Sequence, residues 1–342
     1  MRSVFLLFAV GICLAIFSAF SEETPPRSLA EYGLFTGRLA DLQPAAGVLP
    51  YTLNSPLFSD YSTKYRFVQL PAGQSATYTD AQVMDFPVGT VIAKTFAYPT
   101  QPKRPEAGET LVETRILRHE ADGWRAYPYV WNEAQTDAKL KLTGDNREIA
   151  IRTPDGKKRT VAYHVPNVNE CKGCHYYGGK LQPIGPSARQ LNGNHAYPEG
   201  TANQLDHWAT AGMLTALPRP AERPRLVHYD DPTAPLHERA RAYLDANCGH
   251  CHRPDGPAGT SGMFLHAAET DPAAWGVGKP PVAAGRGAGD RRYGIEPGQP
   301  DRSILTYRMA STDPGERMPE LGRALVHTEG VELIRAWIAQ MQ

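Results

Sequence analysis

The sequence lacks an excess of charge of either sign. Its 342 residues include 36 Lys and Arg and 36 Asp and Glu, so the formal net charge is zero. A protein whose main partner is nucleic acid needs a basic face to neutralise phosphates, and the charge balance argues against such a partner. With 41% hydrophobic residues the chain is also too apolar to be disordered, and its length suffices for two or three compact domains.

Long apolar runs are absent beyond the N-terminus. Residues 4–17 are almost entirely apolar, follow Arg2 and precede the small residues 18–21. This is the layout of a secretory signal peptide, with cleavage expected after Ser21. The run is shorter than the roughly 20 apolar residues that a spanning helix needs, and no run of spanning length follows. We therefore expect residues 1–21 to be a signal peptide and the mature protein to lie in the periplasm without a membrane span.

Cysteine is scarce, with five residues in the chain, and export would ordinarily predict disulfides. The placement of the cysteines predicts otherwise. Outside the signal peptide each belongs to one of two C-x-x-C-H segments, Cys171-Lys-Gly-Cys174-His175 and Cys248-Gly-His-Cys251-His252. C-x-x-C-H is the attachment motif of c-type haem, because two thiols at this spacing can each form a thioether to one vinyl group of the same haem. The histidine that ends each motif is then placed under the iron as its proximal ligand.

Zinc and a redox dithiol are the competing interpretations. Paired C-x-x-C zinc sites are typically about 15 to 20 residues apart. Here Cys174 and Cys248 are much farther apart, and zinc would leave both following histidines unexplained. A thioredoxin-like dithiol would account for one pair only. The sequence therefore predicts two covalently bound haem c groups, held by Cys171, Cys174, His175, Cys248, Cys251 and His252.

Short β-branched and aromatic runs separated by turns predict strands in the N-terminal half. The expected strands are 65–70, 75–79, 90–98, 110–119, 124–131, 139–142, 148–152 and 159–165. We expect residues 22–165 to form an antiparallel β-sandwich-like domain. Trp124, Tyr127, Tyr129 and Trp131 are expected to form a row in the core, with a ligand-binding face as the alternative. His119 is expected at the surface or at an edge.

Helical patterns return in the second half. Apolar spacing predicts helices over 203–214, immediately before the second haem motif, and over 329–340. A charged, proline-rich segment indicates a linker. We therefore expect a first haem segment (166–216), a linker (217–231) and a C-terminal domain (232–342). The helix that leads into the second motif is expected to cross the terminal helix over the haem edge.

Residues 232–342 resemble a small class I cytochrome c. The matching features are a C-x-x-C-H near the start of the domain, the sequence Arg317-Met318-Pro319 downstream of it and a closing amphipathic helix. In that family the methionine before proline is the distal iron ligand, so the resemblance implies this role for Met318. A neutral, soft thioether raises the potential relative to a second imidazole. Met309 and Met263 are the alternatives, in less typical positions.

The mature chain as a whole is similar to a family of exported dihaem c-type cytochromes with a strand-rich N-terminal region. The resemblance is carried by residues 51–61, 165–175, 183–192 and 203–205. It implies a cofactor content, two haem c groups, rather than a pathway.

The first haem motif departs from the cytochrome c pattern, because no Met-Pro sequence follows it before the linker. The sixth ligand of that haem stays open among Met213, His195, His207, another residue and no ligand at all. Arg189 is a candidate partner for a haem propionate, with a solvent-exposed arginine as the alternative.

Three functions are consistent with these features. The leading expectation is an electron carrier between a periplasmic redox protein, such as a dehydrogenase, and an acceptor, with no catalytic residue of its own. The second is a dihaem peroxidase-type enzyme with an open coordination site at the first haem. The third is a strand domain that binds a ligand or partner, for which the aromatic residues of 124–131 are the only support.

Overall fold

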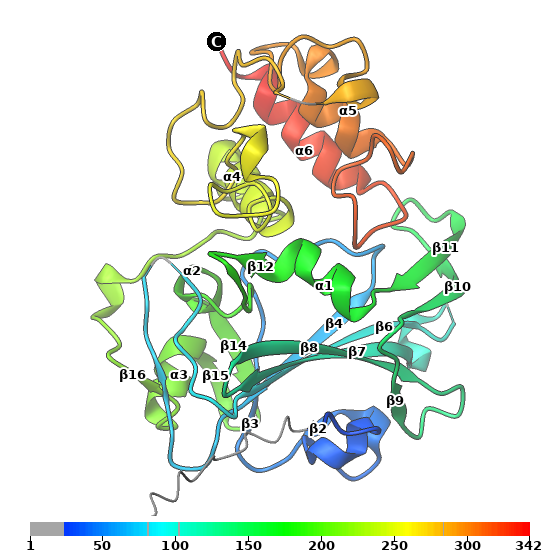
Figure 1. Ribbon diagram of the computed structural model, residues 1–342, viewed down its shortest axis with the longest axis vertical. Coiled ribbons are helices and arrows are strands. Elements are labelled where there is room, and N and C mark those ends of the chain that lie inside the picture. Colours follow the sequence, from blue (N-terminus) through cyan, green and yellow to red (C-terminus); the bar gives the residue numbers. More distant parts are fainter. Residues whose placement is uncertain (1–23, 81, 102, 283) are drawn as a thin grey trace, which may run out of the picture.

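The computed structural model describes residues 24–80, 82–101, 103–282 and 284–342. The predicted signal peptide, residues 1–21, lies outside the described residues. Figure 1 shows a strand-rich lower part, a helical upper part and helix α1 (Val168–His175) between them. Within the described ranges, no helix is both long enough and apolar enough to cross a membrane.

A six-stranded antiparallel sheet forms the centre of the N-terminal half, in the order β3-β4-β6-β7-β8-β9. Its strands are β3 (Val48–Pro50), β4 (Thr63–Gln69), β6 (Val91–Pro99), β7 (Glu109–Glu120), β8 (Gly123–Trp131) and β9 (Ala138–Leu140). Most of these strands are rich in β-branched and aromatic residues, which favour the extended backbone. Gly123, at φ 125°, allows the tight connection from β7 to β8. The predicted antiparallel sheet is confirmed.

Different elements cover the two faces of this sheet. One face packs on the N-terminal segment in a core that includes Leu29 and Leu34. The other face is covered by a separate hairpin, β10 (Asp145–Arg152) with β11 (Lys158–Val165), and by α2 (Ala188–Leu191) and α3 (Gln204–Thr210). Among the described residues, no second sheet of comparable size faces the first.

The remaining strands are short. They are β1 (Phe35–Thr36) with β2 (Gln43–Pro44), β12 (Tyr176–Tyr177) with β13 (Lys180–Leu181), β14 (Asn194–Tyr197) with β15 (Gly200–Asn203), and β5 (Ala76–Thr77) with β16 (Leu214–Thr215). The last pair is parallel, and its Thr215 hydroxyl donates to the carbonyl of Ala76, 139 positions away in the chain. Short 3-10 helices lie at Leu29–Tyr32, Leu39–Asp41, Pro105–Ala107, Pro220–Glu222, Gly259–Ser261, Gly285–Ala288 and Pro300–Arg302.

The aromatic residues of β8 do not form one row. Tyr129 and Trp131 are fully buried in the core against the N-terminal segment, as predicted. Trp124 lies on the opposite face, against Phe86, because side chains alternate along a strand. His119, expected at the surface or at an edge, is half-buried near the end of β7. Its ring stacks on Trp124 with centroids 4.6 Å apart, and its Nδ1 lies 2.9 Å from the carbonyl oxygen of Phe86.

The C-terminal part has a hydrophobic core of its own. Its helices are α4 (Leu236–Asn247), α5 (Ile304–Ala310) and α6 (Thr328–Ala339), and the predicted helices before the second motif and at the C-terminus are therefore present. Helices α4 and α6 approach closely at Gly330, where a Cβ atom would overlap the ring of Tyr243.

We expect Gly330→Val to lower the free energy of unfolding by about 2–3 kcal/mol, because the added side chain forces α4 and α6 apart. The matched control is Glu332→Val, at an exposed position of the same helix. Urea unfolding of the two variants tests this expectation. Equal unfolding midpoints would contradict the close approach at Gly330.

The segment between β3 and β4 runs between the two halves of the molecule. The backbone N–H of Phe58 donates to Asn247 Oδ1 at 2.8 Å, and the Phe58 ring stacks on His327 with centroids 4.1 Å apart. Asp60 accepts hydrogen bonds from the backbone N–H groups of residues 324 and 325, at 2.9 Å and 2.7 Å. The halves are thus joined by direct contacts as well as by the chain at 217–231.

Candidate functional site

The first C-x-x-C-H motif ends helix α1. Asn167 caps this helix, because its side chain accepts a hydrogen bond from the N–H of Glu170 at 3.0 Å. Glu170 Oε2 in turn accepts from the N–H of Asn167 at 2.9 Å, which completes a capping box. Residues three apart lie on the same side of a helix, and Cys171 and Cys174 both border one cavity.

His175, the last residue of α1, is held in one tautomer. Its Nδ1 lies 2.8 Å from the carbonyl oxygen of Gln182, so Nδ1 carries the proton and donates it. The lone pair of Nε2 is therefore left for another partner. Burial lowers the pKa of His175 to about 4, so the imidazole is neutral at pH 7. A neutral imidazole oriented by a carbonyl through its other nitrogen is the form that ligates metals.

The second motif forms the turn that follows α4. His252 Nδ1 lies 3.2 Å from the carbonyl oxygen of Met263 and 3.3 Å from Ser261 Oγ, which favours the same tautomer as at His175. Burial lowers the pKa of His252 as well. The turn is tight, because a Cβ at Gly249 would lie 2.8 Å from the Cα of His266.

Two adjoining cavities border the motifs. Cavity 1, of about 250 Å³, lies between the sheet and the first motif and is lined by Cys171, Cys174 and His175. Cavity 2, of about 520 Å³, is lined by the second motif together with Met263, Leu305 and Met318. Every site residue predicted from the sequence thus borders a cavity. Met318 lines both cavities.

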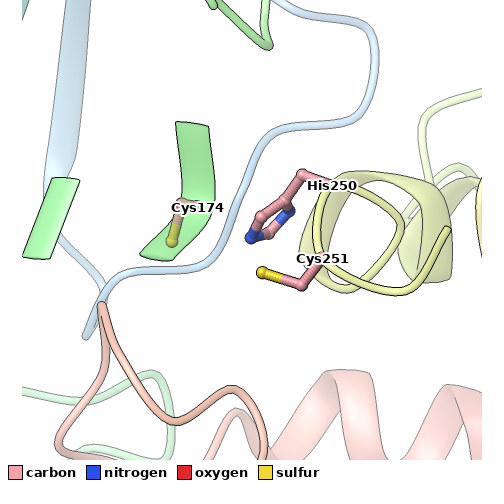
Figure 2. A group of neighbouring side chains, drawn as sticks. All are labelled: Cys174, His250 and Cys251. Atoms are coloured by element: carbon pink, nitrogen blue, oxygen red, sulfur yellow. The ribbon is translucent and has the colours of Figure 1, made fainter. Parts of the chain in front are cut away.

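The two motifs meet in space (Figure 2). The thiol of Cys251 donates to the carbonyl of Gly173 at 3.1 Å. The sulfurs of Cys174 and Cys251 and a ring nitrogen of His250 all lie within 4.8 Å of one another, and the three side chains point toward a common centre. The interaction between the two sulfurs lowers the pKa of Cys174 and raises that of Cys251. The buried His250 is a site residue that the sequence analysis did not identify.

Arg323 holds the segment that carries Met318. This arginine is 6% exposed. Its Nη2 donates to the carbonyls of Met318 at 2.8 Å, Ser311 at 3.0 Å and Arg308 at 3.2 Å, and its Nη1 donates to the carbonyl of Leu325 at 3.0 Å. One guanidinium therefore ties together the backbone on both sides of Met318. The sequence analysis did not identify this residue, since nothing in its local pattern distinguishes it from a surface arginine.

The alternatives to Met318 differ in their surroundings. The methyl group of Met263 fills the space beside Gly276 and Gly294, where side chains would otherwise lie. Met309 borders both cavities but is buried in the core of the C-terminal part.

The candidate sixth ligands of a first haem lie away from both cavities. Met213 packs in the core with Trp208. The rings of His195 and His207 both pack on Tyr197, with centroids 4.7 Å and 3.6 Å away. In contrast, Arg189 does border cavity 1, and its Nη1 lies 3.5 Å from Asp245 Oδ1.

No family model, curated protein or solved structure matches this chain. The site is therefore interpreted from its own chemistry. Each cavity is lined by cysteine thiols, by the neutral imidazole of a motif and by the thioether of Met318. These are soft donors of the kind that bind iron or zinc rather than magnesium or calcium.

Proposed function

We propose that the chain is a periplasmic dihaem c-type cytochrome that transfers single electrons between a redox donor, such as a dehydrogenase, and an acceptor protein. The observation that carries this proposal is the pair of C-x-x-C-H motifs. His175 borders cavity 1 and His252 borders cavity 2, and each of these histidines has an Nδ1 that faces a backbone carbonyl. A single zinc site at Cys174, His250 and Cys251, or a redox dithiol, would leave His175 and His252 unexplained.

The walls of both cavities fit a haem, a flat apolar ring that carries two carboxylates. Cavity 2 is lined mainly by apolar side chains such as Ile304, Leu305 and Met263. Cavity 1 also has apolar walls and contains the buried Arg66, whose Nη2 has no hydrogen-bond partner. An arginine of this kind suits a propionate.

The residues that would hold each haem follow from the motifs. Thioethers would form at Cys171 and Cys174 for the first haem and at Cys248 and Cys251 for the second, with His175 and His252 as proximal ligands and Met318 as the distal ligand of the second. When bound, each iron supplies one-electron chemistry. The protein fixes the tautomer of each histidine and holds the Met318 segment through Arg323.

The contact between the motifs supports a carrier function. Electron tunnelling falls steeply with distance, so two attachment points close together have a physical use. The sulfurs of Cys174 and Cys251 lie within 4.8 Å of one another, although one precedes the segment 217–231 and the other follows it.

We also propose that residues 232–342 form a class I cytochrome c-type domain and that residues 22–165 form a sandwich-like domain. The close approach of α4 and α6 at Gly330, and the shared cavity of His252 and Met318, support the first assignment. The hairpin β10–β11, which covers part of the six-stranded sheet, supports the second.

A dihaem peroxidase-type enzyme is the second candidate. It is favoured by the position of Met213, His195 and His207, none of which borders cavity 1. An open coordination site at the first haem would give a high-spin spectrum and rapid peroxide turnover. The carrier function predicts low-spin haems and reversible reduction instead.

We expect the mature protein to contain two haem groups after expression with the c-type maturation machinery. A pyridine haemochrome spectrum and the intact mass measure this number. Cys171→Ala/Cys174→Ala and Cys248→Ala/Cys251→Ala are each expected to retain one haem. Colourless protein whose sulfurs all react with an alkylating agent, or which binds zinc through Cys174, His250 and Cys251, would refute the proposal.

A further inference from the structure

Three cationic side chains lie side by side across the central sheet. Arg66 on β4 pairs in register with Lys94 on β6, and Lys94 pairs with Arg115 on β7. Directly paired residues of antiparallel strands share a face, and like charges at such positions destabilise a sheet. We call these three residues the cation row.

The cation row faces the first haem motif across cavity 1. All three of its side chains border this cavity, as do Cys171 and His175. The charge of Lys94 acts on His175, and that of Arg115 acts on Cys171. The cations and the motif therefore border the same cavity and lie within electrostatic reach of one another.

The carboxylate of Glu113 does not balance the three positive charges of the cation row. Arg115 is paired, since its Nε and Nη2 donate to the carboxylate of Glu113 at 2.9 Å and 2.6 Å. The hydroxyl of Tyr163 also donates to Glu113, at 2.5 Å. The carboxylate of Glu113 therefore already accepts hydrogen bonds from Arg115 and Tyr163, and it forms no ion pair with Arg66 or Lys94.

Arg66 and Lys94 have unused donors. Arg66 is 6% exposed, its Nη1 makes one long hydrogen bond to the carbonyl of Lys64 at 3.4 Å, and its Nη2 has no partner. The Lys94 ammonium lies 4.8 Å from the centroid of the Phe96 ring and makes no hydrogen bond or ion pair with the residues that the structure describes. Burial and the charges of Arg66 and Arg115 lower the pKa of Lys94 well below its usual value. Burying cations without an anionic partner is costly, so a compensating anion is expected here.

We propose that Arg66, Lys94 and Arg115 form a binding site for a carboxylate or small oxyanion inside cavity 1. Charge-assisted hydrogen bonds from Arg66 Nη2 and Lys94 Nζ would hold the anion. It has two possible sources. One is a propionate of the first haem, and this source rests on the proposed function. The other is a free oxyanion that enters the cavity.

The experiment uses the full-length protein with its haems attached. Lys94→Met and Arg66→Gln each remove one charge of the row, and Lys94→Arg keeps it. Arg118→Met is the control, because Arg118 is a buried arginine on the other face of β7, paired with Glu120 at 2.7 Å. The measurements are the midpoint potential of each haem, the propionate vibrations in resonance Raman spectra and a calorimetric titration with sulfate.

A propionate ligand predicts that Lys94→Met and Arg66→Gln lower the potential of one haem only and shift its propionate vibrations. Lys94→Arg and Arg118→Met should resemble wild type, and sulfate should not bind. A free oxyanion predicts instead that wild type binds one sulfate per chain and that Lys94→Met weakens this binding at least tenfold. Either result supports the site and identifies its source.

Unchanged potentials and vibrations in both variants, together with no sulfate binding by wild type, would overturn the proposal. In that case Lys94→Met should raise the thermal midpoint, because it relieves repulsion within the row. If either Lys94→Met or Arg66→Gln does not fold, the remaining variant and the sulfate titration of wild type still test the anion site. A protein without haem would contradict the proposed function, whereas two haems with unchanged properties would contradict the anion site alone.

Discussion

In the proposed dihaem protein, Arg323→Met is expected to detach Met318 from the iron of the second haem while both haems stay covalently bound. The guanidinium of Arg323 donates to four backbone carbonyls around Met318. Each hydrogen bond to a charged donor contributes about 1.5–3 kcal/mol, and carbonyls left without a donor in a buried site add to the loss. The segment that carries Met318 should therefore lose its fixed position.

Three signals should change together in the Arg323→Met protein. The weak near-infrared band of methionine-ligated ferric haem should disappear, the potential of the second haem should fall, and the free energy of unfolding should decrease by at least about 2 kcal/mol. Met318→Ala should reproduce the first two changes. Arg302→Met, at a side chain that is 68% exposed in the same part of the protein, is the control. A near-infrared band that persists in Met318→Ala would exclude Met318 as the ligand.

The two haems are expected to titrate as an interacting pair. The sulfurs of Cys174 and Cys251, through which they would be attached, lie within 4.8 Å of one another. A unit charge about 15 Å away shifts an equilibrium by about 1 kcal/mol at an effective dielectric constant of about 20. Reduction of one haem should therefore make reduction of the other less favourable, and the measured potentials should belong to the pair.

A redox titration compared with those of the single-haem variants tests this coupling. The wild-type curve should be broader than the sum of the curves of Cys171→Ala/Cys174→Ala and Cys248→Ala/Cys251→Ala. The circular dichroism of the wild-type Soret band should also show two lobes of opposite sign, which each single-haem variant should lack. A wild-type titration curve equal to the sum of the two variant curves would show that the haems are independent.

The local elements of this fold could be predicted from the sequence, because they depend on local patterns. β-branched runs predicted the strands of the sheet, and apolar spacing predicted α4 and α6. The prediction of a single aromatic row failed at Trp124. Side chains alternate between the two faces of a strand, so an even-numbered position such as 124 lies on the opposite face from positions 127, 129 and 131.

The relations between distant segments could not be predicted. The attachment residues were identified because C-x-x-C-H is a compact motif, and Met318 was named through a resemblance. The row of Arg66, Lys94 and Arg115 depends on strand register. The meeting of Cys174 with His250 and Cys251, and the hold of Arg323 on the Met318 segment, depend on packing between distant segments. A single sequence carries no signal for such pairings.

The parallel pairing of β5 with β16 determines which part of this protein could be transplanted. Because the bond between Thr215 and Ala76 spans 139 positions, the first motif lies inside a chain loop that is closed at both ends. Residues 166–216 therefore cannot be grafted onto another scaffold as a cassette, since their partners are strands far upstream. The part around α4, α5 and α6 has a hydrophobic cluster of its own, so its exchange would have to preserve the contacts with Phe58, Asp60 and Gly173.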